Sequence, residues 1–149
     1  GVVGAASSAG VLLKDPHVKQ TTGLFGKLTI GLVGIGSIEP SFLVASSGNV
    51  FSTEELQKIR HRGAVGDICL RFYDSAGREV RDAIGNRVIG IDLETFKRIP
   101  RAVAIAGGSR KHAAILGALR GKLINILITD QFTGARLLKD SSAKTPEIG

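Results

Sequence analysis

The sequence predicts an α/β fold: a three-layer, mostly parallel, Rossmann-like sheet with helices on both faces. Short runs rich in Val, Ile and Leu alternate along the chain with segments whose apolar residues recur at helical spacing. The runs are apolar at consecutive positions, which is the pattern of strands buried on both faces of a parallel sheet. The predicted strands are residues 28–35, 67–72, 88–91, 102–106 and 123–129.

Four helices are predicted from residues that favour helix starts. Ser52 and Glu55 have the spacing of a capping box, and the helix that they open runs through residue 62 and stops at Gly63. The other three helices cover residues 93–99, 110–119 and 131–139, and their predicted N-caps are Asp92, Ser109 and Asp130. In helix 110–119 the predicted buried face consists of Ala113, Leu116 and Leu119, flanked by Ala114 and Ile115.

The remaining segments predict smaller features. Residues 74–78 predict a hairpin turn, which adds an antiparallel element to the sheet. Helical patterns occur around residues 11–13 and 17–28, and no strong strand precedes them, which suggests that upstream strands are missing. We expect the polar tail, residues 140–149, to be frayed.

Length and composition exclude several classes of protein. The 149 residues suffice for one domain with a real core. The single cysteine, Cys69, excludes an intramolecular disulfide framework and a multi-cysteine zinc site, and it fits a reducing compartment, so we expect a cytoplasmic protein. No run reaches the ~20 apolar residues that span a bilayer, and no signal peptide is recognisable, so no membrane association is expected.

The formal net charge of +7 suggests nucleic-acid binding at first sight. Its distribution argues against that reading, because residues 58–122 carry 14 Lys and Arg and six acids, spread between apolar stretches. One Tyr and no Trp are available to stack on bases. A basic rim around an anionic small ligand explains the charge better.

The strongest local motif is the stretch AGGSRK at residues 106–111, where a buried strand leads through two glycines into a helix. Gly107 and Gly108 allow the backbone to approach a ligand, and Ser109 and the helix start offer donors to an anion. Lys111 adds a mobile positive charge. In open parallel sheets, ligands bind beyond the carboxyl ends of the strands, where this loop lies. The alternative is a plain glycine-rich connection with solvated bases.

Two further loops lie at expected strand ends. Gly36 and Ser37 follow the first predicted strand and combine a flexible backbone with a hydroxyl group. Asp67, after Gly66, is an acid at the head of an apolar strand, where a carboxylate accepts hydrogen bonds either from a ligand's hydroxyl groups or from its own turn. For both loops, a tight turn without ligand contact is an equally open reading.

Evidence for catalysis is missing from the sequence. His17, His61 and His112 share no metal-ligand spacing with Cys69, and each lies in a predicted helix. No GxSxG elbow is present, and no local pair of acids stands at strand ends to divide acid and base roles. We therefore expect a binding domain with no catalytic residue, metal or cofactor.

Taken in order, five motifs resemble the effector-binding domain of SorC-type, DeoR-like bacterial sugar-responsive transcriptional regulators. The order and spacing agree across residues 28–138. The motifs are residues 63–68 (GAVGDI), 71–74 (RFYD) with Gly77, 87–91 (RVIGI), 106–111 (AGGSRK) with Ala114 and Ile115, and 128–130 (ITD).

The resemblance implies a fold similar to that of sugar-phosphate isomerases and glucosamine-6-phosphate deaminases, used to sense a phosphorylated sugar or polyol. Asp67 would accept hydrogen bonds from sugar hydroxyls, Lys111 would contact the ligand's oxygens or phosphate, and Gly107 and Gly108 would supply close backbone contact. Cys69, two residues beyond Asp67, would lie on the same strand face and line the pocket. Gln131 stands where the family commonly has an acid, so no ligand contact is expected from that position.

The resemblance also implies partners. Residues 1–149 would form the latter part of one effector-binding domain in a homo-oligomeric dimer or tetramer, and operator DNA would bind through an N-terminal helix-turn-helix domain absent from this sequence. The ligand would shift the arrangement of subunits and so control DNA binding. A sugar-phosphate isomerase or deaminase is the alternative function.

Overall fold

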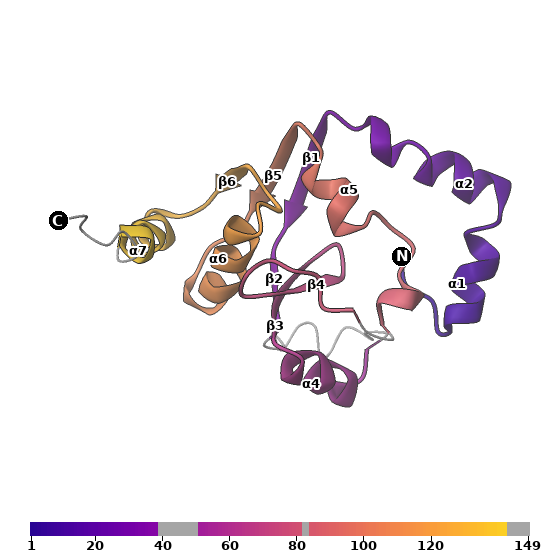
Figure 1. The fold of residues 1–149 in the computed structure, drawn as a ribbon, viewed down its shortest axis with the longest axis horizontal. Coiled ribbons are helices and arrows are strands. Elements are labelled where there is room, and N and C mark those ends of the chain that lie inside the picture. The colour runs from indigo at the N-terminus through magenta and orange to yellow at the C-terminus, as the bar shows by residue number, and fades with distance from the viewer. Residues whose placement is uncertain (39–50, 82–83, 143–149) are drawn as a thin grey trace.

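A computed structural model describes residues 1–38, 51–81 and 84–142. Its centre is a parallel sheet in the order β1-β5-β6, formed by β1 (Ile30–Gly34), β5 (Arg101–Ile105) and β6 (Ile126–Ile128) (Figure 1). The register pairs Leu32 with Val103 and Val103 with Ile126. The predicted α/β class with a parallel sheet is therefore confirmed, and three of the five predicted strands form this sheet with ends shifted by one to three residues.

A second, antiparallel sheet in the order β2-β3-β4 lies beside the first. It consists of β2 (Gly36–Ser37), β3 (Ala64–Ile68) and β4 (Arg71–Asp74). The strand predicted for residues 67–72 is wrong, because Cys69 and Leu70 adopt positive φ angles of 53° and 63° and reverse the chain between β3 and β4. Consecutive apolar residues did not reveal this turn, since it contains neither Gly nor Asn.

The helices mostly begin where capping residues predict them. In α4 (Thr53–His61) Ser52 and Glu55 form the complete capping box, and in α5 (Leu93–Lys97) the Asp92 carboxylate accepts the Thr95 N–H at 2.7 Å. In α7 (Gln131–Ser142) the Asp130 carboxylate accepts the Thr133 N–H at 2.9 Å. The last helix thus extends through residues 140–142 of the predicted frayed tail, and residues 143–149 lie outside the described part.

The fourth predicted helix differs from its expectation. Residues 109–111 form the 3-10 turn η3 (Ser109–Lys111), and the α-helix begins only afterwards as α6 (His112–Arg120). Ser109 therefore caps neither element with its side chain. The buried face of α6 is also rotated from the predicted one and consists of Ala114, Ile115, Gly117 and Ala118, while Ala113 is exposed. These small residues allow α6 to pack closely between the two sheets, where Gly117 approaches the Asp74 carbonyl.

The N-terminal segment forms α1 (Ala6–Leu12), α2 (Pro16–Thr22) and the 3-10 turn η1 (Phe25–Lys27), which agree with the predicted helical patterns. These elements extend away from the sheets and α7 lies at the opposite end of the molecule (Figure 1). The strand predicted at residues 88–91 is wrong. Residues 85–87 form the 3-10 turn η2 (Gly85–Arg87), and Val88 makes only an isolated bridge with Val2. The hairpin turn at residues 74–78 is confirmed, with Tyr73 bridged to Glu79.

Two apolar clusters hold the described residues together. The larger cluster joins the parallel sheet to α5 and α6, with Gly31 so close to Phe96 and Ile99 that a side chain there would collide with both. The smaller cluster lies under α4, between β3, β4 and η2, and includes Ile59, Phe72 and Val88. Within the described residues, α5 and α6 cover one face of the parallel sheet, and the other face carries no such cluster. None of the described helices is long and apolar enough to cross a membrane.

Candidate functional site

The glycine loop after β5 lies at the carboxyl end of the parallel sheet, as the sequence predicts. Ala106 still donates its N–H to the Ile128 carbonyl at 3.1 Å, so the sheet continues to the edge of the loop. Gly108 then adopts φ 91° and ψ 152°, a conformation that only glycine enters without strain. The chain turns there into η3, which ends at Lys111.

The loop is held by the start of α7. The Gly108 N–H donates to the Asp130 carboxylate at 3.1 Å and to the Thr133 hydroxyl at 2.9 Å, and that hydroxyl donates to Asp130 at 2.7 Å. These donors lower the pKa of Asp130 to about 2. A Cβ on residue 107 would overlap the Asp130 carboxylate, so Gly107 is required for close packing here. The N-cap role of Asp130 is confirmed, and its anchoring of the glycine loop was not foreseen.

Asp67 lies in β3 directly opposite Gly36 of β2, so the structure brings two sequence-predicted loops together. Its Oδ2 accepts the Leu70 N–H at 3.1 Å across the turn. Burial raises the pKa of the Asp67 carboxyl, although the Leu70 N–H and the positive charge of Lys111 oppose this effect. The Lys111 charge is therefore near enough to the Asp67 carboxyl to act on its pKa. The Lys111 ammonium has no ion-pair partner among the described residues.

A small basic cavity is lined by chain neighbours of these residues, Val65 on β3 and Arg110 on η3. It has a volume of about 180 Å³, and Ser37, Arg60 and Arg110 contribute its polar side chains. Ser37 extends from β2 and Arg110 from η3, and these two elements are in contact. Arg60 comes from the last turn of α4 and was not predicted as a site residue. Hydroxyl and guanidinium donors that converge on one cavity suit a phosphate or a carboxylate.

A larger cavity, of about 370 Å³, lies between the glycine loop and α7. Gly108 and Ser109 line it from the loop, and Phe132, Thr133 and Arg136 line it from α7. Ser109 therefore lines this cavity, and its side chain caps no helix. The hydroxyl oxygen of Thr129, beside Gly107, is buried and has no hydrogen-bond partner among the residues that the structure describes. In the sequence, only one feature of Thr133 and Arg136 indicates a place near the site. Both lie in the first two turns of a predicted helix that follows a strand.

Cys69 does not occupy its predicted place. It lies in the turn between β3 and β4, is exposed, and so does not share a strand face with Asp67. Burial and the nearby negative charge of Asp67 nevertheless raise the pKa of the Cys69 thiol. The thiol is thus a neutral neighbour of the carboxylate at the edge of the site and forms no part of a strand-lined wall.

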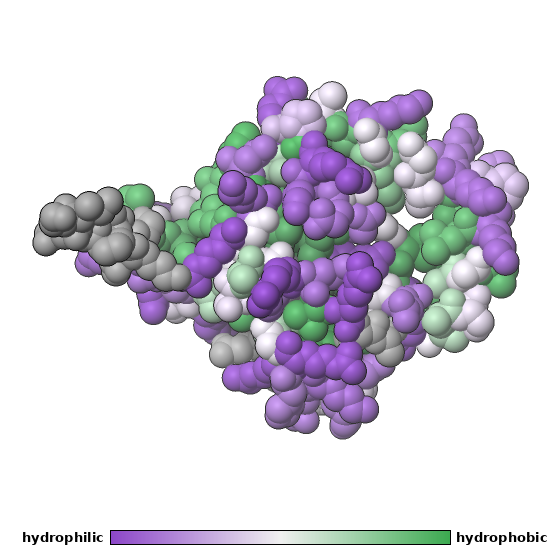
Figure 2. Space-filling model, in the orientation of Figure 1, coloured by the Kyte–Doolittle hydropathy of each residue, from purple (hydrophilic) through white to green (hydrophobic). Residues whose placement is uncertain are grey.

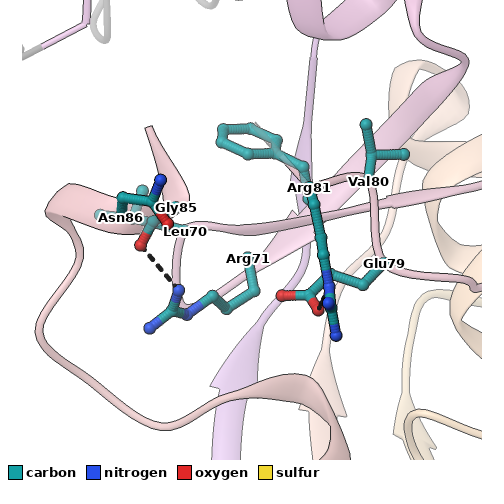
Figure 3. A pocket seen from close by; sticks show the side chains of 8 residues that line it. Leu70, Arg71, Glu79, Val80, Arg81, Gly85 and Asn86 are labelled. Carbon is teal, nitrogen blue, oxygen red and sulfur yellow. Dashed lines mark hydrogen bonds and ion pairs between the residues drawn. The ribbon is translucent and has the colours of Figure 1, made fainter. Parts of the chain in front are cut away.

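A third cavity is separate from this region. It has a volume of about 250 Å³ and lies beside β4, where Arg71 donates to the Gly85 carbonyl at 2.9 Å (Figure 3). Arg71 also donates to the Val88 carbonyl at 3.2 Å, so its guanidinium ties η2 to the antiparallel sheet. The exposed Arg81 forms an ion pair with Glu79 at 3.4 Å, and the two side chains line the same cavity next to each other (Figure 3). These contacts give Arg71 a structural role. Among the described residues no cluster of His, Cys, Asp and Glu could hold a metal ion.

The parallel sheet β1-β5-β6, the glycine loop that follows β5 and the helices packed on the sheet define an α/β domain. Residues 2–139 match the family described as "Putative sugar-binding domain", and the chain belongs to that family.

Similar proteins are transcriptional regulators. The deoxyribonucleoside regulator of Bacillus subtilis is 37% identical over 85% of this chain and 40% of its own length. The solved sorbitol operon regulator of Klebsiella pneumoniae is 30% identical over 92% of this chain and 44% of that one, with a TM-score of 0.83. A solved sugar-binding domain of a transcriptional repressor from Vibrio fischeri is 31% identical over 95% of this chain and 56% of that one, with a TM-score of 0.84. The chain thus spans about half or less of these relatives.

The resemblance to the SorC and DeoR types of regulator is therefore confirmed.

Proposed function

We propose that this chain is the ligand-sensing part of a transcriptional regulator of carbohydrate or polyol metabolism, and that its effector is a phosphorylated sugar or polyol. The observation that carries the proposal is the cavity lined by Ser37, Arg60 and Arg110, together with a Lys111 charge near enough to Asp67 to lower its pKa. Carboxylate oxygens accept hydrogen bonds from sugar hydroxyls, whereas guanidinium and ammonium groups favour a phosphate. One ligand that carries both groups uses the whole arrangement.

Each predicted site residue has a place in this proposal. The Asp67 carboxylate accepts hydrogen bonds from the hydroxyl groups of the ligand. Gly36 has no side chain and so leaves space for this carboxylate. Lys111 and Ser37 hold the phosphate together with Arg110, and Gly107 and Gly108 let the ligand approach the backbone. Ser109 lines the adjoining cavity, and Cys69 borders the site from the turn.

The names of the relatives also bear on how the effector would control DNA binding. The operon and deoxyribonucleoside regulators among the relatives support an operator-DNA partner, which we assign to a part of the regulator outside this chain. We further propose a homo-oligomeric, cytoplasmic regulator in which the effector favours one arrangement of subunits. The shift is limited by the difference in the effector's affinity for the two arrangements.

Thermal-shift measurements with sorbitol 6-phosphate and 2-deoxyribose 5-phosphate test the site. Sorbitol, deoxyribose and inorganic phosphate serve as controls for the two halves of the ligand. At a ligand concentration of about 100 Kd, a bound ligand stabilises the protein by about 2.7 kcal/mol, which is easily detected. Lys111→Ala should abolish the shift, and Lys139→Ala on α7 should leave it unchanged.

Two results would contradict the proposal. An equal shift in the Lys111→Ala protein would show that the site is elsewhere. Turnover of ribose 5-phosphate or glucosamine 6-phosphate that depends on Asp67 would instead support a sugar-phosphate isomerase or deaminase.

A further inference from the structure

The first residue of α6, His112, is joined to the last turn of α7 by a side-chain contact. Its Nε2 atom lies 2.5 Å from the Oδ2 atom of Asp140, which is 28 positions further along the chain. A carboxylate oxygen accepts hydrogen bonds, so the Nε2 atom is the donor. The side chains are 12% and 42% exposed, so the histidine is the more deeply placed partner. The contact holds the start of α6 against the end of α7.

The other end of α7 holds the glycine loop, so α7 is joined to the residues on both sides of η3. Gly108 comes directly before η3, and its N–H donates to Asp130 and Thr133 at the start of α7. His112 comes directly after η3 and donates to Asp140. A rise of 1.5 Å per residue places Thr133 and Asp140 about 10 Å apart along the helix axis. A regular helix thus keeps the two ends of η3 at a fixed separation.

The last residue of η3 is Lys111, whose position matters for the proposed site. No ion pair among the described residues holds its ammonium group, so the backbone of η3 sets the direction of this side chain. The Lys111 charge lowers the pKa of the Asp67 carboxyl against the effect of burial, so the two groups are near each other. A rotation of η3 would carry the charge away from Asp67. The placement of Lys111 therefore depends on the contacts at the two ends of η3.

Stability alone does not explain a histidine at residue 112. Its Nδ1 atom is buried and makes no hydrogen bond with any residue that the structure describes. A buried polar atom that lacks a partner costs free energy, and an aliphatic side chain of similar size would avoid this cost. An aliphatic side chain cannot, however, donate the directed hydrogen bond to Asp140.

We propose that His112 is a positioning residue, which Asp140 holds so that η3 keeps Lys111 close to Asp67 and to the effector. This inference rests on the proposed function, because it concerns the affinity of the same site. It also gives α7 a regulatory role. A movement of α7 changes the affinity for the effector, and by thermodynamic linkage the effector favours one position of α7.

Four variants test the role of His112. His112→Ala and Asp140→Ala each remove the contact, whereas His112→Gln keeps an N–H donor on a side chain of similar reach. Glu94→Ala is the matched control, because it removes the 3.1 Å ion pair between Glu94 and Lys97 on α5. Glu94 is 68% exposed, and Figure 2 shows hydrophilic residues over α5 near the centre of the view.

The first measurement needs no effector. NMR titration of the carboxyl carbon of Asp67 gives the pKa of this group in each protein. In His112→Ala and Asp140→Ala the Lys111 charge is no longer held nearby, so the pKa of Asp67 should be higher than in the parent protein. Removal of the Asp140 charge would by itself lower that pKa, so a rise in Asp140→Ala reports the displacement of Lys111. His112→Gln and Glu94→Ala should match the parent protein.

The second measurement is the Kd for sorbitol 6-phosphate and for 2-deoxyribose 5-phosphate, by titration calorimetry. A displaced ammonium group loses its charge-assisted contact with the phosphate, so His112→Ala and Asp140→Ala should bind about tenfold more weakly. His112→Gln and Glu94→Ala should stay within about twofold of the parent protein.

Two outcomes would overturn the role of His112. An unchanged pKa of Asp67 in both alanine variants would show that the contact does not position Lys111. The same changes in His112→Gln as in His112→Ala would show that the donor to Asp140 is not what matters. If neither sugar phosphate binds to the parent protein, the proposed function fails, and the pKa of Asp67 still decides the role of His112.

Discussion

Gly36 of β2 faces Asp67 of β3 so closely that a Cβ on residue 36 would overlap the Asp67 Oδ1 atom. The missing side chain at one position therefore makes room for the carboxylate at the other. The two residues are 31 positions apart, and only the pairing of β2 with β3 brings them together. This contact links the backbone of the first loop to the group that we assign to the recognition of sugar hydroxyls.

Gly36→Ala is predicted to displace the Asp67 carboxylate. The free energy of unfolding should fall by about 1–3 kcal/mol, because the new methyl group forces a shift and the hydrogen bond from Leu70 N–H is lost. Urea denaturation measures this change. Gly34→Ala is the matched control, since a Cβ at Gly34 meets no atom within 4 Å. Equal stability of the two variants would contradict the proposed packing.

Asp67→Asn is predicted to stabilise the protein at pH 7. Burial raises the pKa of Asp67, so the folded chain binds the proton more tightly than the unfolded chain does. Stability from this group is therefore greatest below the unfolded pKa of about 3.9 and is lost as the pH rises through the raised value. The neutral amide avoids this loss and keeps an acceptor for Leu70, so we expect a gain of about 1 kcal/mol.

Urea denaturation of the Asp67→Asn protein at several pH values measures how its gain in the free energy of unfolding depends on pH. The gain should shrink as the pH falls through the raised pKa of the native carboxyl, and it should be absent below the unfolded pKa of about 3.9. Thermal shifts with sugar phosphates should disappear in the same variant. A loss of stability at pH 7 would show that the charged carboxylate is favourably solvated in the folded protein.

Asp130 should make the opposite contribution to the pH dependence of stability. Donors from Thr133 and Gly108 lower its pKa to about 2, below the unfolded value of about 3.9. The stabilisation is therefore complete above pH about 4 and is lost as the pH falls through about 2. In Asp130→Asn, thermal unfolding should depend less on pH across this interval. Thr133→Val removes the hydroxyl donor, so the stabilisation by Asp130 should be lost at a higher pH. An unchanged dependence of Tm on pH in both variants would contradict the role given to Asp130.

The sequence predicts most of the parallel sheet and the positions of its helix starts, because those features depend on local patterns. Buried strands leave runs of apolar residues, and Ser52, Asp92 and Asp130 each cap a helix with their own side chains. The glycine loop is equally local, since two consecutive glycines after a strand are visible without a structure. These same residues supply one wall of the proposed site.

Long-range packing explains what the sequence does not predict. The apolar run that contains Ile68 and Phe72 gives no sign of the turn at Cys69 and Leu70, because its residue types favour strands. The rotated buried face of α6 depends on contact with both sheets, which helical spacing alone does not specify. Arg60 joins the site only because α4 packs beside β3.

The turn between β3 and β4 is predicted to limit the stability of the antiparallel sheet. Cys69 and Leu70 both have positive φ angles, which cost an L-residue about 1–2 kcal/mol unless its side chain tolerates this conformation. Asn tolerates it far better, and Cys69 is exposed, so Cys69→Asn should increase the free energy of unfolding by about 0.5–1 kcal/mol. Cys69→Ser preserves the size of the side chain without Asn's preference and should give a smaller gain. Urea denaturation of the parent protein, Cys69→Asn and Cys69→Ser measures these free energies of unfolding. If Cys69→Asn is no more stable than Cys69→Ser, the turn carries no strain at this residue.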